Sequence, residues 1–263
     1  MIEKVKYDAL VMAAGRGPSD PMATAFHVDH KCLVPVGGTP MLGRVVDALL
    51  KCPCVEHISV SIDDPEAVRT ALGPGPAIEI VPSSTSAPAS VLTALKRPST
   101  QWPVLVTTAD HALLTPKIVS HFVQMAASTG ADLAVGLATR ETITAELPGT
   151  RRTYMKFSDV AVSGCNLFAI NTPEGLNFVR FWQQADKNRK KPWKLIGAFG
   201  VGALTSWMTG GLSLDRAFEL ASEKLGATAV PVLLPFASAA VDVDKPEDKE
   251  LVEQLLAQRP DEP

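Results

Sequence analysis

The sequence predicts an α/β fold: a three-layer α/β/α sandwich around a mostly parallel, mixed sheet of the Rossmann-like kind. Apolar, strand-like runs alternate with helical patterns through the first half of the chain, and the breaks between them are short. The chain has 263 residues, of which 46% are hydrophobic and 20% charged, enough for one large core. Because neither an internal repeat nor a long linker interrupts the pattern, we expect one domain over residues 1–263.

The first half predicts five strands and four helices. Proline suits the first helical turn because its missing N–H has no intrahelical partner there, and Asp64 can cap the helix that follows it. The predicted strands are Tyr7–Met12, His57–Ile62, Ala77–Val81, Trp102–Thr108 and Ala131–Ala138. The predicted helices run from Pro40 to Leu50, from Asp64 to Leu72, from Ala87 to Lys96 and from Thr115 to about Ala127.

The second half is less regular and predicts shorter elements. Its predicted strands are Thr153–Phe157, Val160–Ser163, Asn166–Ile170, Thr228–Leu234 and Ala239–Val243. Its predicted helices run from Pro173 to about Ala185, from Trp193 to Met208, from Ser213 to Leu225 and from Pro246 to Gln258. Between the first two of these helices, Lys187–Lys194 forms a basic loop with one tryptophan.

Charge and hydropathy exclude several classes of protein. The net charge of −3 and the pI of about 6.0 provide no overall basic field, so duplex nucleic acid is not an expected partner. No run approaches the roughly 20 apolar residues of a membrane-spanning helix. The first seven residues include three charged side chains and do not resemble an apolar signal segment. We therefore expect a protein that is not transmembrane, and that is soluble and cytoplasmic.

The four cysteines are expected to be free thiols. Cys52 and Cys54 resemble half of a zinc site, but no second pair follows them. A second, less favoured interpretation places a metal at the dense cluster His27, Asp29, His30 and Cys32, whose ligand types are mixed.

A glycine turn follows the first predicted strand. Gly15 and Gly17 have no Cβ, so backbone N–H groups there could approach phosphate oxygens, with Arg16 and Lys31 supplying positive charge. A dinucleotide-binding turn would need a helix at once, which Pro18 prevents, and the Gly-Lys-Ser/Thr of a P-loop is absent. Taken alone, the turn is equally consistent with a structural strand end.

The wider pattern is more specific. The stretch L-V-M-A-A-G-R-G, followed by H-K-C-L-V-P-V-G-G-T-P-M-L, resembles the signature of nucleotidyltransferases with a GT-A-like fold. These include sugar-phosphate nucleotidyltransferases, methylerythritol-phosphate cytidylyltransferases and the MobA-like NTP transferases that act on the molybdenum cofactor. The resemblance implies the GT-A-type, nucleotide-diphospho-sugar transferase fold. It also implies a nucleotide-binding half at 1–139, and an acceptor-binding half with a C-terminal metal motif at 140–263.

The same resemblance assigns roles to the residues of the turn. It implies that the turn wraps the triphosphate and that Lys31 touches the phosphates, where charge must stabilise the transferring group. The implied nucleotide-binding residues of this region are Ala13, Ala14, Gly15, Arg16, Gly17 and Lys31, with Lys31 and Arg16 also catalytic. The sequence departs from the family where Pro18–Met22 replaces the usual Arg-Met or Arg-Leu, so Arg16 would have to substitute for the second basic residue.

Two aspartates are implied as magnesium ligands. Asp110 ends V-L-V-T-T-A-D, which resembles the strand that carries the family's first metal-binding aspartate, although a lone Asp there can also cap a helix. The stretch A-A-V-D-V-D-K-P-E-D resembles the family's D-x-D-x-P-E-D, whose first aspartate selects Asp242. Asp244 and Asp248 are then expected to cap the terminal helix. Two carboxylates suit Mg²⁺, which keeps water and phosphate oxygens as its other ligands.

The resemblance also places the base and the acceptor. Ser83, Ser84 and Ser90 match the loop that meets the nucleobase, although for the first two an ordinary polar loop is an equally good interpretation. Lys156, Gly164 and Asn166 match the acceptor pocket. The basic loop is by default solvated; a second interpretation is a clamp on an anionic acceptor, or peripheral contact with anionic lipid through Trp193.

The sequence therefore predicts a Mg²⁺-dependent nucleotidyltransferase. It would move a nucleoside monophosphate from a nucleoside triphosphate, with CTP slightly favoured, to a small phosphorylated acceptor and release pyrophosphate. One alternative is a molybdenum-cofactor guanylyl- or cytidylyltransferase. Another is a non-catalytic, nucleotide-binding regulatory module, which the altered glycine turn motivates. A glycosyltransferase shares the fold but would carry its D-x-D after a mid-chain strand, where Asp110 stands alone. The oligomeric state stays open.

Overall fold

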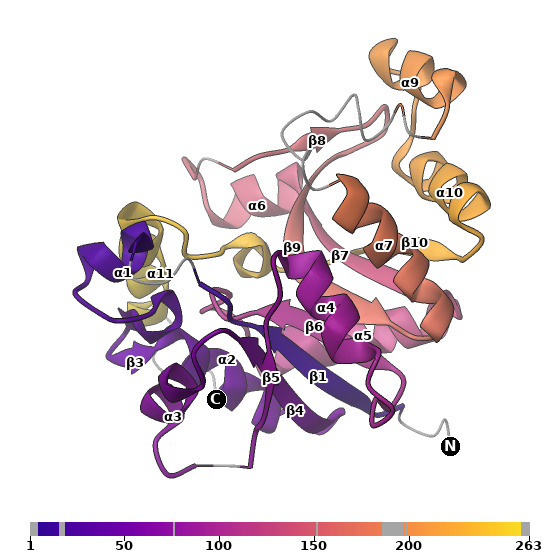
Figure 1. Cartoon of the computed structure of the whole chain (residues 1–263). Helices are drawn as coiled ribbons and strands as arrows, with labels where there is room; N and C mark the ends of the chain where they lie inside the picture. Colours follow the sequence, from indigo (N-terminus) through magenta and orange to yellow (C-terminus); the bar gives the residue numbers. More distant parts are fainter. Residues whose placement is uncertain are drawn as a thin grey trace.

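A computed structural model describes residues 5–15, 19–75, 77–150, 152–185, 197 and 199–258. Within these residues the centre of the molecule is an eight-stranded sheet (Figure 1). Its strand order is β10-β7-β9-β6-β1-β4-β5, and β8 pairs with β9. The strands are β1 (Tyr7–Met12), β4 (Val55–Ile62), β5 (Glu79–Pro82), β6 (Val104–Thr108), β7 (Leu133–Thr139), β8 (Met155–Lys156), β9 (Ala161–Ile170) and β10 (Ala229–Leu233). A separate hairpin joins β2 (Pro35–Val36) to β3 (Thr39–Pro40).

The sheet is mixed and mostly parallel, as the sequence predicts. β1 is parallel to β4 and β6, β4 to β5, and β7 to β10. β9 is antiparallel to both of its long neighbours, β6 and β7. The carboxyl ends of β5, β4, β1, β6 and β7 therefore all reach one edge of the sheet, and there they meet the amino end of β9.

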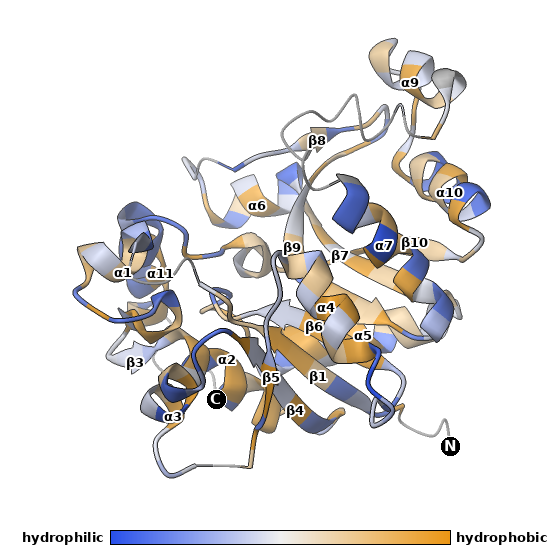
Figure 2. Ribbon diagram, in the orientation of Figure 1, coloured by the Kyte–Doolittle hydropathy of each residue, from blue (hydrophilic) through white to orange (hydrophobic). Residues whose placement is uncertain are grey.

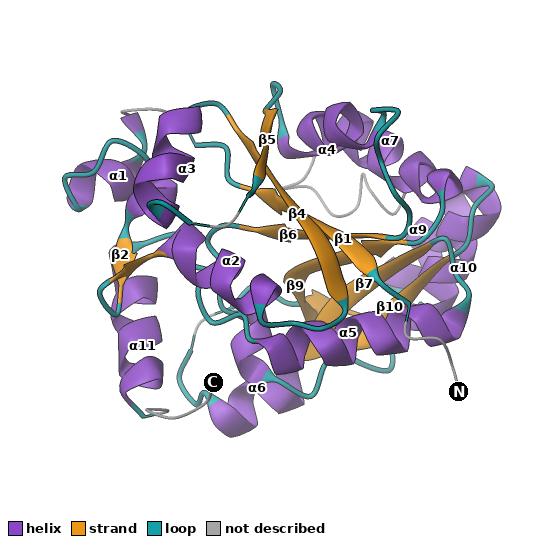
Figure 3. Ribbon diagram, turned by 90° about the horizontal axis from the view of Figure 1, so that it is seen from below, coloured by secondary structure: helices purple, strands orange, loops and turns teal. Residues whose placement is uncertain are grey.

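Helices cover both faces of the sheet, which confirms the predicted layers. α4 (Ala87–Leu95) and α7 (Leu176–Ala185) lie on one face, whereas α2 (Met41–Leu50), α5 (Pro116–Thr129) and α6 (Arg140–Glu146) lie on the other (Figure 3). Alternate residues of β1 divide between two cores: Ala9 and Val11 pack on the α2 and α5 side, and Leu10 and Met12 on the α4 side. Figure 2 shows apolar residues on the strands and on the neighbouring helix α4, with polar residues on the outer surface of α7.

The remaining helices surround this central part. They are α1 (Pro21–Ala25), α3 (Pro65–Leu72), α9 (Val201–Met208), α10 (Leu214–Leu225) and α11 (Pro246–Ala257). Side chains cap two of the helix starts: Asp64, as predicted, accepts a hydrogen bond from the amide of Glu66 at 3.0 Å, and Thr115 accepts one from the amide of Ile118 at 3.2 Å. These side chains satisfy amide groups that have no partner inside the helix, which fixes where each helix begins.

The structure differs from the predicted elements in several places, and it adds the β2–β3 hairpin, which is not predicted. Residues 239–243 do not form a strand: Ala237–Ala240 is a 3₁₀ turn, and the amide of Val243 instead bonds to the carbonyl of Asp110 at 3.0 Å. The two short strands predicted over 160–170 are one strand, β9, in which Asn166 has a φ of +49°. α1 and α6 are not predicted. Of the helix predicted over 193–208, residues 193–196 and 198 lie outside the described residues.

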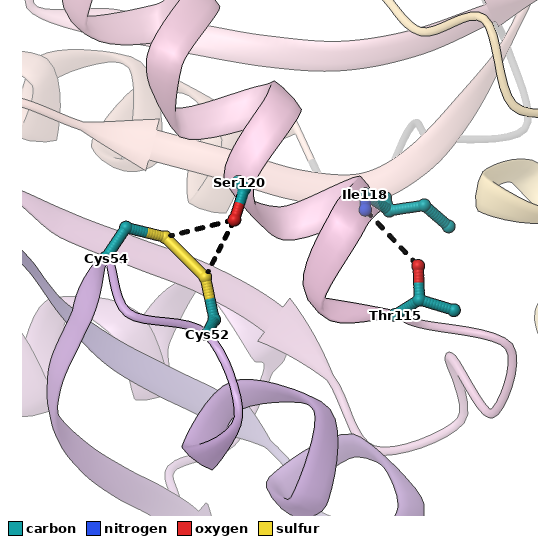
Figure 4. The surroundings of a disulfide bond; sticks show 5 residues. All are labelled: Cys52, Cys54, Thr115, Ile118 and Ser120. Carbon is teal, nitrogen blue, oxygen red and sulfur yellow. Dashed lines mark hydrogen bonds between the residues drawn. A yellow bond between two sulfur atoms is a disulfide. The ribbon is translucent and has the colours of Figure 1, made fainter. Parts of the chain in front are cut away.

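The expectation of four free thiols is wrong for one pair. Cys52 and Cys54 form a disulfide that closes a turn between α2 and β4 (Figure 4). The hydroxyl oxygen of Ser120, on α5, lies 3.2 Å from the sulfur of Cys52 and 3.9 Å from that of Cys54. A single residue, Pro53, separates the two cysteines in the sequence.

The other two cysteines are free, as predicted, and both are buried. Burial raises the pKa of both Cys32 and Cys165 to about 12, so both remain thiols. Across the described part of the chain, three or more His, Cys, Asp or Glu side chains nowhere group as a metal would require, so the alternative metal site at residues 27–32 is wrong. Among the helices of those same ranges, none has the length and apolarity needed to cross a membrane.

Candidate active site

The predicted nucleotide-binding segments lie side by side at the carboxyl edge of the sheet. The amide of Ala13 donates to the carbonyl of Ser61 at 2.9 Å, and the amide of Ala109 donates to that of Met12 at 2.9 Å. The amide of Ser83 donates to the carbonyl of Ile62, also at 2.9 Å. The glycine turn, the serine loop and Asp110 are therefore neighbours, at the edge where open α/β sheets bind ligands.

Asp63 and His30 hold the described part of the glycine turn. The amide of Gly15 donates to Oδ1 of Asp63 at 3.1 Å, and Nε2 of His30 lies 3.1 Å from the same oxygen. A Cβ atom at Gly15 would meet Nε2 of His30 at only 2.8 Å, so a side chain here would force the turn or the imidazole to shift. Arg16 and Gly17 lie outside the described residues, and their predicted roles stay predictions.

The state of His30 follows from its contacts. Its side chain is 2% exposed, and its Nδ1 atom accepts a hydrogen bond from the amide of Cys32 at 3.2 Å. Nε2 therefore carries the proton and donates to Asp63. Burial alone would raise the pKa of Asp63, but the hydrogen bonds from Gly15 and His30 outweigh it and lower that pKa. The turn is thus anchored to an ionised carboxylate.

Lys31 bridges two carboxylates. Its Nζ atom lies 2.7 Å from Oδ2 of Asp110 and 2.6 Å from Oδ1 of Asp244. Burial opposes the charged ammonium group, yet the pKa of Lys31 is raised because the charge of Asp110, together with the hydrogen bonds, more than compensates. Lys31 is therefore a fixed positive charge at the carboxyl end of β6.

Asp110 has an unused ligand atom. Its Oδ1 is buried and has no hydrogen-bond partner among the described residues, while Oδ2 receives Lys31. A buried carboxylate oxygen normally has a partner, so an orphaned one indicates a ligand position. The backbone bond from Val243 to Asp110 brings the C-terminal segment alongside. Asp110 is not the cap of the following helix, because Thr115 caps α5.

Asp242 lies in the same charged cluster as Asp110. Burial, followed by the charges of Asp110 and Asp244, raises the pKa of Asp242, and the charge of Arg152 opposes this. Arg152 donates from Nη1 to Oδ1 of Asp242 at 2.8 Å. The two aspartates implied as metal ligands, 132 residues apart in the sequence, therefore lie close enough for their charges to interact, and their role as ligands stays a prediction.

The cluster contains two residues that the sequence analysis did not place there. Arg152, whose side chain is 9% exposed, binds Asp242 and lies 3.8 Å from Asp248. Asp244 does not cap the terminal helix, contrary to expectation, because its carboxylate faces Lys31. Asp248 does cap it, accepting bonds from the amides of Asp244 at 3.2 Å and Lys245 at 3.0 Å.

The donor set fits a magnesium ion. When all are ionised, the four carboxylates of this cluster face two cationic side chains, which leaves two negative charges in excess. Mg²⁺ prefers hard oxygen ligands and is usually held by one or two carboxylates, with water and phosphate completing the coordination. The unpartnered oxygen of Asp110 and the nearby carboxylate of Asp242 meet that requirement without a third protein ligand.

The serine loop is shaped from within. Ser90 is fully buried, and its Oγ accepts a hydrogen bond from the amide of Ser84 at 2.7 Å. The hydroxyl of Ser90 therefore fixes the loop conformation. Ser83 is partly buried beside the carboxyl end of β4.

The predicted acceptor residues lie on the antiparallel strands next to this edge. Lys156 is exposed on β8, opposite Ala161 of β9, and Gly164 is exposed on β9, opposite Leu137 of β7. Asn166 follows Gly164 and is partly buried. Its left-handed backbone coincides with a register shift between β7 and β9. The basic loop Lys187–Lys194, with Trp193, lies outside the described residues.

Comparisons with known proteins identify the family and the fold of the chain. Residues 9–153 match the MobA-like NTP transferase domain. A hypothetical transferase from Thermus thermophilus is 28% identical and superposes with a TM-score of 0.77 over 93% of this chain and 100% of that chain. No curated protein sequence matches this chain.

Two further solved structures share the fold at lower identity. A 4-diphosphocytidyl-2C-methyl-D-erythritol synthase from Anaerococcus prevotii is 14% identical, with a TM-score of 0.56 over 97% of this chain and 98% of that chain. A CMP:2-keto-3-deoxy-manno-octonic acid synthetase complexed with CTP is 14% identical, with a TM-score of 0.56 over 98% and 100%. Since the family match spans more than half of the chain, and includes the glycine turn, Lys31 and Asp110, the chain belongs to the MobA-like NTP transferase family and is a nucleotidyltransferase.

Proposed function

We propose that this enzyme is Mg²⁺-dependent and transfers a nucleoside monophosphate, from CTP in preference to other nucleotides, to a small phosphorylated acceptor with release of pyrophosphate. The observation that carries the proposal is the buried, unpartnered Oδ1 of Asp110, beside Asp242 and Lys31 and next to the glycine turn. An oxygen ligand, a second carboxylate and a fixed cation at one sheet edge are what phosphoryl transfer to an acceptor requires.

The chain's own residues bind and orient the triphosphate. The turn from Ala13 to Gly15 stands beyond β1 with its backbone close to the edge, and Asp63 keeps Gly15 in place. Lys31 would stabilise the negative charge that builds on the transferring and departing phosphates, because it stays protonated throughout. Asp110 and Asp242 would hold the ion, which when bound supplies positive charge to the α-phosphate and the leaving pyrophosphate.

The acceptor needs no protein nucleophile. Its own phosphate oxygen can attack the α-phosphorus in line with the leaving pyrophosphate, provided that the protein fixes both partners. Gly164 and Asn166 lie on β9, near the carboxyl end of the neighbouring strand β6. Lys156 is on β8, which pairs with β9. We propose that these three residues hold the acceptor, and that the ammonium of Lys156 pairs with its anionic group.

The nucleotide preference is supported by the two structural neighbours. One is complexed with CTP and the other is named for a diphosphocytidyl product. The second candidate function, transfer to the molybdenum cofactor from GTP or CTP, is favoured by the MobA-like family match. A non-catalytic regulatory module is not supported, because Lys31, Asp110 and Asp242 are brought together at one site.

One assay tests the proposal. Pyrophosphate release is measured with each of the four nucleoside triphosphates and Mg²⁺, against a panel of phosphorylated alcohols and sugars and, separately, the molybdenum cofactor. We expect release with CTP and a phosphorylated acceptor, and none when EDTA replaces Mg²⁺. Release with the cofactor alone would favour the second candidate. Equal release with EDTA would contradict the role of the carboxylates as metal ligands.

A further inference from the structure

Lys31 contacts two carboxylates in this structure, and it must leave at least one of them if it binds the phosphates of the nucleotide. Its ammonium group lies on Oδ2 of Asp110, the proposed metal ligand, and on Oδ1 of Asp244, which the transfer reaction does not need. We propose that Asp244 positions Lys31 across Asp110, where its ammonium competes with the divalent cation, so that the cation enters only together with the triphosphate that draws Lys31 away. This inference rests on the proposed function and adds an order of binding to it.

The ammonium of Lys31 and a divalent cation compete because both would lie close to Asp110. Mg²⁺ binds carboxylate oxygens at about 2.1 Å, so a cation on either oxygen of Asp110 would lie within about 7 Å of the ammonium of Lys31. The side chains of Lys31 and Asp110 are only 17% and 21% exposed, so water screens the repulsion of these like charges weakly. A cation alone is therefore repelled by the ammonium of Lys31, which offsets part of the negative charge that would otherwise attract it.

Exposure makes the exchange feasible. The side chain of Asp244 is 60% exposed, so when Lys31 leaves, this carboxylate is simply hydrated and little free energy is lost. Asp110 is less exposed and would be left as a poorly solvated charge, unless a cation replaces the ammonium at once. Phosphate oxygens offer the ammonium hydrogen bonds of the same charge-assisted kind. The departure of Lys31 and the arrival of the cation are therefore linked at Asp110.

The position of Asp244 distinguishes it from the other acidic residues of the segment. Asp242 is held by Arg152, and Asp248 accepts the amides that begin α11. The carboxylate of Asp244 has Lys31 as its partner and forms none of these structural contacts. It is therefore a positioning residue that acts through Lys31.

The first experiment measures Mn²⁺ binding to the full chain without nucleotide, from the electron paramagnetic resonance signal of free Mn²⁺. We expect weak binding by the wild type and by Lys31→Arg, which keeps the charge. Lys31→Met and Lys31→Gln should both bind Mn²⁺ about tenfold more tightly, because the competing cation is gone. Lys249→Met is the matched control: Lys249 is 14% exposed and paired with Glu253, and its loss should leave Mn²⁺ binding unchanged. Thermal melts verify that each variant is folded.

The second experiment isolates Asp244 with a double-mutant cycle. In the Lys31→Met background, Asp244→Asn removes only a negative charge and should weaken Mn²⁺ binding. In the wild-type background, Asp244→Asn also releases Lys31 from its position over Asp110 and so reduces the competition with Mn²⁺. The loss of Mn²⁺ affinity should therefore be several-fold smaller than in the Lys31→Met background. An equal effect in both backgrounds would show that Asp244 does not act through Lys31. Asp47→Asn, also 60% exposed and paired with a lysine, is the control.

The outcomes separate this inference from the proposed function. If the wild type releases pyrophosphate with none of the four nucleotides, the proposed function fails. If it is active, but Lys31→Met and Lys31→Gln bind Mn²⁺ no more tightly than the wild type, only the competition is overturned. Adding CTP without acceptor should raise the Mn²⁺ affinity of the wild type far more than that of Lys31→Met, and an equal gain would also contradict the exchange.

Discussion

The amide of Gly15 donates a hydrogen bond to Oδ1 of Asp63 at 3.1 Å, so the residue that follows β4 holds the turn that follows β1. The same oxygen receives Nε2 of His30, the residue before Lys31. One carboxylate therefore ties the proposed phosphate-binding turn to the segment that carries the lysine. Such an anchor sets the turn before the nucleotide arrives, which lowers the ordering cost of binding.

Asp63→Ala should loosen the turn. We expect the KM for the nucleotide to rise about tenfold with a smaller change in kcat, because a charge-assisted hydrogen bond to Gly15 is lost. The neighbouring Asp64→Ala removes the cap of α3 instead and should lower the melting temperature while leaving KM unchanged. Steady-state kinetics on both variants provide the measurement. An equal change in KM for the two would refute the anchoring role.

Gly15→Ala should disturb the same turn sterically. The added methyl would meet Nε2 of His30 at 2.8 Å, so either the turn or the imidazole must shift. We expect the KM for the nucleotide to rise, and the double variant Gly15→Ala, His30→Ala to recover part of the loss, because the smaller side chain leaves room. Gly202→Ala in α9, where nothing lies within 4 Å, is the control. Failure of the double variant to recover would place the strain elsewhere.

Asp110→Asn and Asp110→Ala test the central carboxylate. We expect turnover to fall on the order of 1,000-fold with the fold intact, because the charged ligand oxygens at the metal position are lost. Pyrophosphate release gives the rate, and far-ultraviolet circular dichroism verifies the fold. Asp47→Asn, an exposed aspartate paired with Lys51, should retain full activity. Unchanged turnover in the Asp110 variants would remove Asp110 from the mechanism.

Arg152→Met should destabilise the folded protein. The arginine is 9% exposed and neutralises Asp242, so its loss leaves a poorly solvated carboxylate and should cost about 3 kcal/mol in urea unfolding. Asp242→Asn in the same chain should recover part of that loss. Arg69→Met, in an exposed pair with Glu66, should change stability by no more than about 0.5 kcal/mol. Similar losses at the two arginines would contradict the role of Arg152.

Asp132 should contribute stability that depends on pH. It accepts hydrogen bonds from Thr172 Oγ1 at 2.6 Å and from the amide of Thr228 at 2.7 Å, and these bonds lower its pKa from the ordinary 3.8. Because the folded-state pKa is depressed, the contribution is complete above pH 3.8 and is lost as the pH falls through the lower, folded value.

Asp132→Asn provides the measurement. We expect this substitution to lower the free energy of unfolding by about 1 kcal/mol at pH 7. The loss is this small because Asp132 is largely exposed and water weakens its hydrogen bonds. Urea unfolding at pH 7 and pH 3 should show the difference between wild type and variant shrinking at the lower pH. A difference that stayed constant, or grew, would contradict this sign. Asp47→Asn again serves as the surface control.

Sequence reasoning recovered the sheet because its central strands are continuous apolar runs with clear ends. β1 was predicted with its observed bounds, and the starts of α3 and α5 followed from the caps at Asp64 and Thr115. It failed where the pattern was short or bent. α1 has only five residues, although Asp20 caps it, and residues 239–243 look like a strand but turn aside to bond with Asp110.

The candidate site was recovered only in part, for a related reason. Lys31, Asp110 and Asp242 each stand in a recognisable local motif. Asp244, in contrast, meets Lys31 across 213 positions, and Arg152 meets Asp242 across 90, so no local pattern encodes either contact. Asp63 could have been found: it directly follows a strand that reaches the ligand-binding edge.

The backbone bond from Val243 to Asp110 has a consequence for the newly made protein. Synthesis proceeds from the N-terminus, so β1, β4 and β6 can pair well before residue 243 leaves the ribosome. Asp242 and Asp244 can join Asp110 and Lys31 only after residues 242–244 have been made. A nascent chain can therefore pair β1, β4 and β6 while it still lacks the two acidic residues that complete the cluster.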